Sequence, residues 1–193
     1  WEEENAPYTL PEDYKAFLQI FDGMSLSWRI KRGDQEIPLG NMHLNKLRDI
    51  KRIKGESFKF GRIGQNDADS SDDDDEGSKE EIAAFEIDSE TKNGRVALLF
   101  KGGSNQKPQI WFQDLSCKWY YIANTFTDYF RVMVMHLGIP NWQYAFTQCG
   151  LDQQTLQWFR FFIPERLSID IENRKFLEMM AKKKLTSNIK PNS

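Results

Sequence analysis

The sequence is poor in cysteine and has no long apolar run. Two cysteines occur among 193 residues, Cys117 and Cys149, without another cysteine or a histidine at metal-site spacing. This pattern predicts plain reduced thiols in an intracellular protein. There is also no signal peptide, no Asn-x-Ser/Thr acceptor and no membrane-spanning stretch, so we expect neither secretion nor a membrane partner. The chain starts at Trp1, which leaves open a targeting segment before it.

Recognised catalytic motifs are also missing. The sequence has no G-x-S-x-G elbow, no H-E-x-x-H helix and no G-x-x-x-x-G-K-[ST] phosphate loop. His43 and His136 are far apart and have no neighbouring cysteine or paired carboxylates in the sequence, so we expect structural or surface roles for both. An EF-hand beginning at Asp67 fails because Asp72 and Ser78 occupy the positions that need glycine and glutamate. We therefore predict no catalytic residue, no metal and no cofactor.

Charge is distributed unevenly along the chain. The net charge is −3, but residues 67–81 hold nine acidic residues and one lysine, a net −8, which leaves +5 for the rest. Because this stretch cannot bury enough apolar surface to order itself, we predict a flexible acidic insertion over about residues 55–81. A solvated, self-repelling loop is the main interpretation, and a docking tract for a basic surface is the alternative.

The N-terminal third predicts a helix, a strand pair and a second helix. Residues 10–18 form an amphipathic helix, with Gly23 as its left-handed stop. Strict alternation over residues 24–31 predicts a half-buried strand, followed by a turn near Gly33 and a short run at 37–39. Three apolar residues suggest a short amphipathic helix next, namely Leu44, Leu47 and Ile50.

The remainder predicts antiparallel strands followed by helices. Two strand pairs are expected, 82–88 with 95–100 and 109–114 with 118–122. A helix begins at Thr125, capped reciprocally with Asp128, and ends at Gly138 and Pro140. Its predicted buried stripe comprises Phe126, Tyr129, Phe130, Met133, Val134 and Leu137. Further helical pieces are expected at 141–146, 152–161 and 171–184.

These elements give an α+β fold class with a mainly antiparallel sheet packed with helices, plus a helical C-terminal extension. We predict an α+β domain over residues 8–140 that contains the acidic insertion. An aromatic-rich helical extension would cover 141–185, and a polar tail would cover 186–193.

A basic cluster lies on the exposed side of the third element. Its members are Arg48, Lys51, Arg52 and Lys54. A solvated helix face is the commonest explanation for such a cluster, and contact with an acidic protein tail is the main alternative. The cluster has no interleaved aromatic residues and no recognised nucleic-acid motif, so we predict no nucleic-acid partner.

Aromatic residues are concentrated after residue 141. The candidate partner-binding residues are Trp142, Tyr144, Phe146 and Trp158, followed by Phe159, Phe161 and Phe162. So much aromatic area in a short stretch either seals the core or forms a docking surface, since Trp and Tyr dominate interface hot spots. Core packing is the simpler interpretation.

The motif Leu10-Pro11-Glu12-Asp13-Tyr14, continuing to Phe17-Leu18 and Asp22-Gly23, resembles the opening helix of the SUKH superfamily. That superfamily includes the yeast cell-wall-assembly regulator and many bacterial immunity proteins. The strands 85–88 and 96–100, Ile110-Trp111-Phe112 and the run 123–130 fit the same pattern. The resemblance implies an α+β binding module without enzymatic activity.

A closer resemblance is to the tubulin polyglutamylase complex subunit 2 family. Its most specific segment is His136-Leu137-Gly138-Ile139-Pro140-Asn141-Trp142-Gln143-Tyr144-Ala145-Phe146-Thr147, and the similar stretches together span about residues 10 to 162. The acidic insertion and the helix after Pro164 do not visibly match. The resemblance implies a non-catalytic accessory subunit, partnered by a tubulin-tyrosine-ligase-like catalytic subunit, by other polyglutamylase subunits and by tubulin. It implies a place in the cytoplasm on the cytoskeleton, at cilia, basal bodies or centrosomes.

Under this hypothesis, residues 142–162 dock a partner subunit and the basic cluster near Lys51 faces acidic tubulin. The alternative is a structural SUKH-like protein stably bound to axonemal microtubules. An enzyme in its own right is a distant third possibility, since it would need a polar pocket that one sequence does not reveal.

Overall fold

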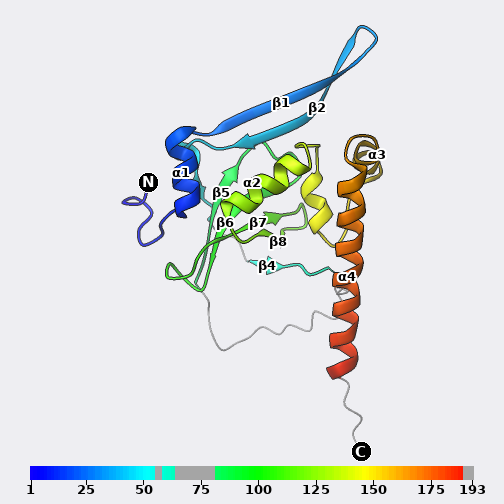
Figure 1. Ribbon diagram of the computed structural model, residues 1–193. Coiled ribbons are helices and arrows are strands. Elements are labelled where there is room, and N and C mark those ends of the chain that lie inside the picture. Colours follow the sequence, from blue (N-terminus) through cyan, green and yellow to red (C-terminus); the bar gives the residue numbers. More distant parts are fainter. Residues whose placement is uncertain (55–57, 64–80, 189–193) are drawn as a thin grey trace, which may run out of the picture.

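The protein is described by a computed structural model that covers residues 1–54, 58–63 and 81–188, with side chains described as far as Lys183. Two separate sheets and a set of helices make up this part of the chain (Figure 1). The predicted flexibility of residues 55–57 and 64–80 lies outside the described residues, as does the end of the predicted polar tail at 189–193.

The N-terminal helix and the hairpin after it confirm most of the pattern in the sequence. Helix α1 (Glu12–Ile20) is followed by the antiparallel strands β1 (Met24–Arg32) and β2 (Gln35–Leu44). Gly23 was predicted to end α1 in a left-handed conformation. It does have a left-handed conformation (φ 84°), but α1 ends earlier, at the extended residue Phe21, and Gly23 directly precedes β1. The second strand is also much longer than the run predicted at 37–39.

A six-stranded sheet forms the centre of the molecule, in the order β3-β5-β6-β7-β8-β4. Neighbouring strands are antiparallel except for β4 and β8, which are parallel. Both predicted strand pairs are confirmed. The strands are β3 (Lys51–Arg52), β4 (Lys59–Phe60), β5 (Ile82–Asp88), β6 (Arg95–Lys101), β7 (Gln109–Gln113) and β8 (Lys118–Ala123).

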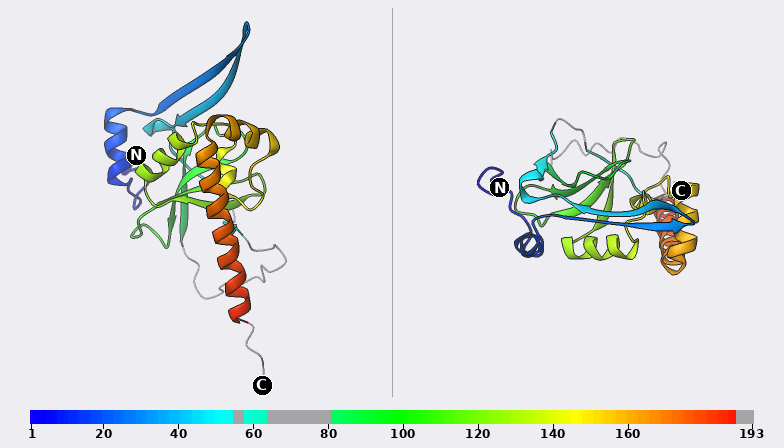
Figure 2. Two further views of the ribbon diagram at one scale, coloured as in Figure 1. Left: turned by 45° about the vertical axis from the view of Figure 1, so that its right-hand side comes forward. Right: turned by 90° about the horizontal axis from the view of Figure 1, so that it is seen from above.

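Helices cover one face of this sheet (Figure 2). The helical elements are α2 (Phe126–Met135), the 3₁₀ helix η3 (Trp142–Phe146), α3 (Gln153–Phe162) and α4 (Pro164–Asn188). The predicted cap is confirmed, because Thr125 accepts a hydrogen bond from the Asp128 N–H. Val134 was wrongly placed in the buried stripe of α2, since it is 42% exposed. Helix α4 starts earlier than predicted and runs through residues 186–188, which were expected in the tail.

Alternation along the central strands divides the core between the two faces of the sheet. In β6, Val96, Leu98 and Phe100 belong to the large cluster on the helix-covered face. Ala97 and Leu99 lie on the other face, where Trp119, Phe58 and Phe60 pack against them. The large cluster also takes in Trp142, Phe159, Ile163 and Leu167, so α3, α4 and η3 share one core with the sheet.

Two sequence expectations before residue 81 are wrong. Leu44 ends strand β2, and the predicted helix around Leu47 and Ile50 is only the single 3₁₀ turn η1 (Leu47–Asp49), followed by β3. Pairing with β5 holds this segment extended in place of a helix. Strand β4 also lies inside the predicted flexible insertion. It is held there because Phe60 packs on Trp111 at 5.1 Å and Phe58 on Trp119 at 5.7 Å.

The predicted fold class is confirmed: the chain is α+β, with a mainly antiparallel sheet packed with helices and further helices at its C-terminal end. In the part of the chain that the structure describes, each helix is too short or too polar to cross a membrane. Strands β1 and β2 project beyond the sheet at one end of the molecule, and the C-terminal half of α4 projects at the opposite end (Figures 1 and 2).

Candidate functional site

The predicted basic cluster lines a surface hollow at the edge of the six-stranded sheet. The hollow has a volume of about 600 Å³ and lies between the N-terminal segment and residues 47–54. Its lining comprises Trp1, Glu4, Asn5, Leu47, Arg48, Ile50, Lys51, Arg52 and Lys54. The structure therefore brings all four predicted basic residues together, although on a 3₁₀ turn and an edge strand in place of a helix face. We call this feature the basic hollow.

The backbone beside the basic hollow is an open sheet edge. Strand β3 pairs with β5 on one side, and in the described residues no strand pairs with its other side. The Ile53 N–H donates to the Ala84 carbonyl at 2.9 Å, so the backbone groups of Ile53 and of Lys51 face β5. Because these directions alternate along an antiparallel strand, the N–H and C=O of Arg52 face outward. A partner could pair with this edge.

The N-terminal segment forms the opposite wall of the basic hollow. The Trp1 indole N–H donates to the Ile50 carbonyl at 2.9 Å, and the Trp1 ring packs edge-on against Phe85 at 4.9 Å. The Arg52 guanidinium lies over the Tyr8 ring, 5.4 Å from its centroid. Burial, together with the hydrogen bond to Glu81, raises the pKa of Tyr8, so its hydroxyl stays protonated. These contacts fix the positions of Trp1 and Arg52 against the buried rings of Phe85 and Tyr8.

The charge of the basic hollow is strongly positive. Arg48 has a side chain 76% exposed and forms an ion pair with its neighbour Asp49 at 3.6 Å. Lys51, Arg52 and Lys54 are exposed as well. Among the described residues that line the hollow, Glu4 supplies one carboxylate against four cationic side chains. Such a surface attracts an acidic partner and does so less strongly as salt is added.

The aromatic candidates differ in exposure. Trp142 is 2% exposed and stacks on His136 at 4.9 Å, so core packing is the better account of its side chain. Tyr144 is half-buried, and its hydroxyl donates to the Asn93 carbonyl at 2.8 Å. Phe146 and Trp158 are also half-buried. Docking by these three side chains stays a prediction, with Phe161 (78% exposed) and Phe162 (37%) as their most accessible neighbours.

A buried polar cluster links α2 to α4, and no local pattern of residues indicates it. The fully buried His136 places Nδ1 at 2.7 Å from the Val132 carbonyl and Nε2 at 2.9 Å from an Asp170 carboxylate oxygen. Arg166 donates to the other Asp170 oxygen. The partners come from positions 34 residues apart, so only the fold reveals the pairing. Both ring nitrogens face acceptors, which suits a structural clamp between helices and agrees with the structural role expected for this histidine.

A second histidine joins β2 to β5. His43 Nδ1 lies 3.0 Å from an Asp88 carboxylate oxygen, and Nε2 lies 3.8 Å from Glu90. The hydrogen bond to Asp88 is the main reason why the pKa of His43 is raised. The same Asp88 carboxylate accepts the Thr91 hydroxyl and the Glu90 N–H. This carboxylate is occupied by structural contacts, and the pair holds the base of the β1–β2 hairpin against the sheet.

The described residues contain no cluster of three or more side chains suited to holding a metal ion. Cys117 and Cys149 are both free and exposed. The geometry of the basic hollow suits recognition of an acidic chain.

Comparison with known proteins places the chain in a family. The SMI1 / KNR4 family (SUKH-1) model matches residues 2–132. The chain is 34% identical over 177 residues to "Tubulin polyglutamylase complex subunit 2" of Rattus norvegicus, a match that covers 85% of this chain and 60% of the relative. The same-named proteins of Mus musculus (33% identical) and Homo sapiens (34% identical) match 85% of the chain as well.

The chain spans only about 60% of the length of these relatives. No solved structure matches it. The family model covers more than half of the chain, including α1, strands β1 to β8 and most of α2. The chain therefore belongs to the SMI1 / KNR4 (SUKH-1) family, and its predicted resemblance to tubulin polyglutamylase complex subunit 2 is confirmed.

Proposed function

We propose that this chain is a non-catalytic accessory subunit of a tubulin polyglutamylase complex and helps to assemble or target the ligase on microtubules. The observation that carries the proposal is the similarity over 85% of the chain to proteins named as subunit 2 of that complex. A separate tubulin-tyrosine-ligase-like subunit would perform the ATP-dependent ligation. The protein would then reside on the cytoskeleton, at cilia, basal bodies or centrosomes.

The basic hollow supports a direct role in binding tubulin. The proposal takes the binding partner to be an acidic segment of tubulin. Four exposed cations lie beside the open edge of β3, where the backbone N–H and C=O of Arg52 point outward. An extended acidic segment could pair with the edge while its carboxylates contact Lys51 and Lys54. The half-buried aromatic residues Tyr144, Phe146 and Trp158 would contact a partner subunit.

The first experiment is gentle affinity purification of the tagged protein from its native cell, with mass spectrometry and a glutamylation assay on the eluate. Recovery of a ligase-like subunit together with tubulin-glutamylating activity is the expected result. Recovery of axonemal proteins alone, released only by harsh extraction and without ligase activity, would instead indicate a permanent structural component of microtubules.

The basic hollow is tested separately by microtubule co-sedimentation. The triple variant Lys51→Glu, Arg52→Glu, Lys54→Glu reverses the charge of β3 and its flank, and we expect at least about tenfold weaker binding at low salt. The matched control reverses three exposed cations at the far end of the β1–β2 hairpin: Arg29→Glu, Lys31→Glu and Arg32→Glu. Equal loss in both variants would mean that only net charge matters, and unchanged binding in the first would remove the basic hollow from the proposal.

A further inference from the structure

Side chains beside the basic hollow alternate between the two faces of the six-stranded sheet. The tyrosine ring beneath Arg52 belongs to the large core cluster, whereas Ile53 packs against the small cluster on the other face. The bond from the Ile53 N–H to the Ala84 carbonyl continues the pairing with β5 by one residue beyond β3. Because side chains alternate along an extended chain, Lys51 shares the face of Ile53, and Lys54 shares the face of Arg52. An apolar side chain therefore lies between cationic ones.

The part of this edge that a partner can pair with is short. At one end, the Ile50 carbonyl accepts the Trp1 indole N–H at 2.9 Å, so that outward group is occupied. Among the described residues, the next outward groups along the edge are the N–H and C=O of Arg52, because those of its two neighbours face β5. A partner segment that pairs with Arg52 would therefore lie opposite residues 51–54 and would stop at Trp1.

The cations along this edge differ in how much of their charge is offset by the sheet itself. Lys51 is directly opposite Glu86 of β5, so a carboxylate lies on the same face and offsets its charge. Arg52 is opposite the apolar residue Phe85. Arg52, together with Lys54 on the same face, therefore attracts carboxylates more strongly than Lys51 does.

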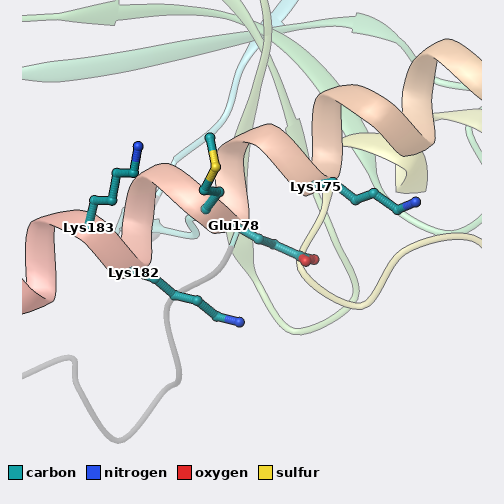
Figure 3. A pocket seen from close by; sticks show the side chains of 5 residues that line it. Lys175, Glu178, Lys182 and Lys183 are labelled. Atoms are coloured by element: carbon teal, nitrogen blue, oxygen red, sulfur yellow. The ribbon is translucent and has the colours of Figure 1, made fainter.

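Charge alone does not distinguish the basic hollow, because lysines also gather on α4. Lys175, Lys182 and Lys183 project from the helix around Glu178 and line a hollow of about 400 Å³ (Figure 3). The backbone N–H and C=O groups of these lysines are bonded within the helix and cannot pair with an extended segment. The basic hollow offers cationic side chains and outward backbone groups together, which favours recognition of an extended acidic chain.

We propose that the basic hollow binds an extended segment of tubulin in which an acidic, an apolar and a second acidic residue follow one another. The segment pairs antiparallel with β3, because only then can one residue exchange both backbone hydrogen bonds with Arg52. Side chains directly opposite each other in such a pair lie on the same face, with their Cβ atoms about 5 Å apart. Two carboxylates then meet Lys54 and Arg52, and the apolar side chain between them covers Ile53. This inference rests on the proposed role of the basic hollow in binding tubulin.

A contact with Ile53 makes recognition partly independent of charge. Ile53 is half-buried, at the margin of the small cluster that contains Ala84 and Trp119. An apolar side chain placed over it removes apolar surface of both partners from water. Salt screens the attraction between carboxylates and cations but not this contact, so the preference for an apolar residue should persist at high ionic strength.

Fluorescence anisotropy with three labelled peptides tests this pattern on the whole chain. Between flexible Gly-Ser ends, the first peptide contains Glu-Ile-Glu-Glu, the second contains Ile-Glu-Glu-Glu, and the third contains four glutamates. The first should bind at least about fivefold more tightly than the second, which cannot place isoleucine opposite Ile53 and carboxylates opposite both Arg52 and Lys54. It should also bind more tightly than the more highly charged third peptide, and both preferences should persist from about 50 to 300 mM salt. Equal affinities, or tightest binding by the third peptide, would overturn the proposal.

Variants of the chain locate the effect on β3 and its flank. Ile53→Ser should abolish the preference for the first peptide over the second, while the affinity for the four-glutamate peptide changes by less than about twofold. Arg52→Glu should weaken the binding of all three peptides by at least about tenfold. The matched control, Lys175→Glu, reverses an exposed cation on α4 and should leave all three affinities unchanged. Thermal unfolding checks that each variant remains folded, and an unchanged preference in folded Ile53→Ser would contradict the assignment. The comparison of peptides on the wild type needs no variant.

Microtubule co-sedimentation separates this inference from the proposed function. Suppose that the peptides show the preference but the triple variant of the basic hollow still binds microtubules as the wild type does. The acidic and apolar pattern then stands, and the assignment of the segment to tubulin fails. Loss of microtubule binding in the triple variant without any preference among the peptides would instead mean that the basic hollow binds tubulin by charge and that the pattern is wrong.

Discussion

Two antiparallel hairpins in this molecule have different local patterns and very different surroundings. In β6, the inner strand of the β5–β6 hairpin, the five residues from Val96 to Phe100 are all buried. In β1, no position of the nine is buried, and Leu26 is 47% exposed. The residues differ in the same sense: β6 is a continuous apolar run from Val96 to Phe100, which is typical of a strand covered on both faces, whereas β1 alternates apolar and polar residues, which is typical of a strand covered on one face at most. The pattern of each strand therefore indicates how many neighbouring layers cover it.

The β1–β2 hairpin is anchored by contacts at its middle. The Trp28 indole N–H donates to the Leu137 carbonyl at 2.7 Å, and its ring packs edge-on against Phe162 at 5.3 Å. Gly40, opposite Trp28, gives the ring room, because a Cβ there would lie 1.7 Å from the indole nitrogen. An isolated two-stranded hairpin is marginal in water. These anchors therefore explain how the hairpin holds its position beside the sheet.

The largest expected effect separates the two hairpins directly. Leu98→Ala, at a fully buried position of β6, should lower the free energy of unfolding by about 3 kcal/mol, because it removes buried apolar atoms and leaves a cavity. The same substitution at Leu26, in β1, should lower it by less than about 1 kcal/mol. Urea denaturation of both variants measures the difference. Equal losses would mean that the hairpin contributes to global stability as much as the sheet does.

A smaller effect tests the anchor at the middle of the hairpin. Trp28→Phe keeps an aromatic ring against Phe162 but removes the hydrogen bond to Leu137, at an expected loss of about 1 to 2 kcal/mol. Amide hydrogen exchange should show faster exchange in residues 24–44 and unchanged protection in β5 and β6. Faster exchange throughout the sheet would show that the hairpin and the sheet unfold as one unit.

The smallest effect depends on pH. The pKa of His43 is raised in the folded state by Asp88, with further contributions from Glu90 and Asp49, so its charged form stabilises the fold. This stabilisation is complete below the ordinary histidine pKa of about 6.5 and is lost as pH rises through the folded pKa. The stability difference between the wild type and His43→Asn should therefore shrink as pH rises from about 5.5 to 8.5. Thermal unfolding at several pH values measures this, and a difference that grew with pH would contradict the assignment.

Local patterns sufficed for the elements whose partners lie close in sequence. Turn residues between short strand-like runs predict the strand pairs from Ile82 to Ala123, and capping chemistry predicts the cap formed by Thr125 with Asp128. The gathering of four basic residues was also visible, because they lie within seven positions.

Pairings between residues far apart in the sequence could not be predicted from local patterns. The short β3 strand owes its conformation to β5, more than thirty positions away, and not to its own residues. Strand β4 lies in a polar stretch whose only hint was the spacing of Phe58 and Phe60. The buried contact of His136 with Asp170 likewise depends on how α4 folds back, so the sequence could suggest a structural histidine but not its partner.

The two edge strands of the six-stranded sheet have a further consequence for how selective the protein is in crowded surroundings. Each is two residues long and carries lysine or arginine, with Lys51 and Arg52 on β3 and Lys59 on β4. Short, cationic edges resist stacking with the sheets of other proteins, because an approaching neutral or basic strand would have to bury these charges. The cationic side chains that would bind an acidic segment therefore also disfavour edge-to-edge association with other proteins. One set of charges would contribute both to binding and to resistance against aggregation.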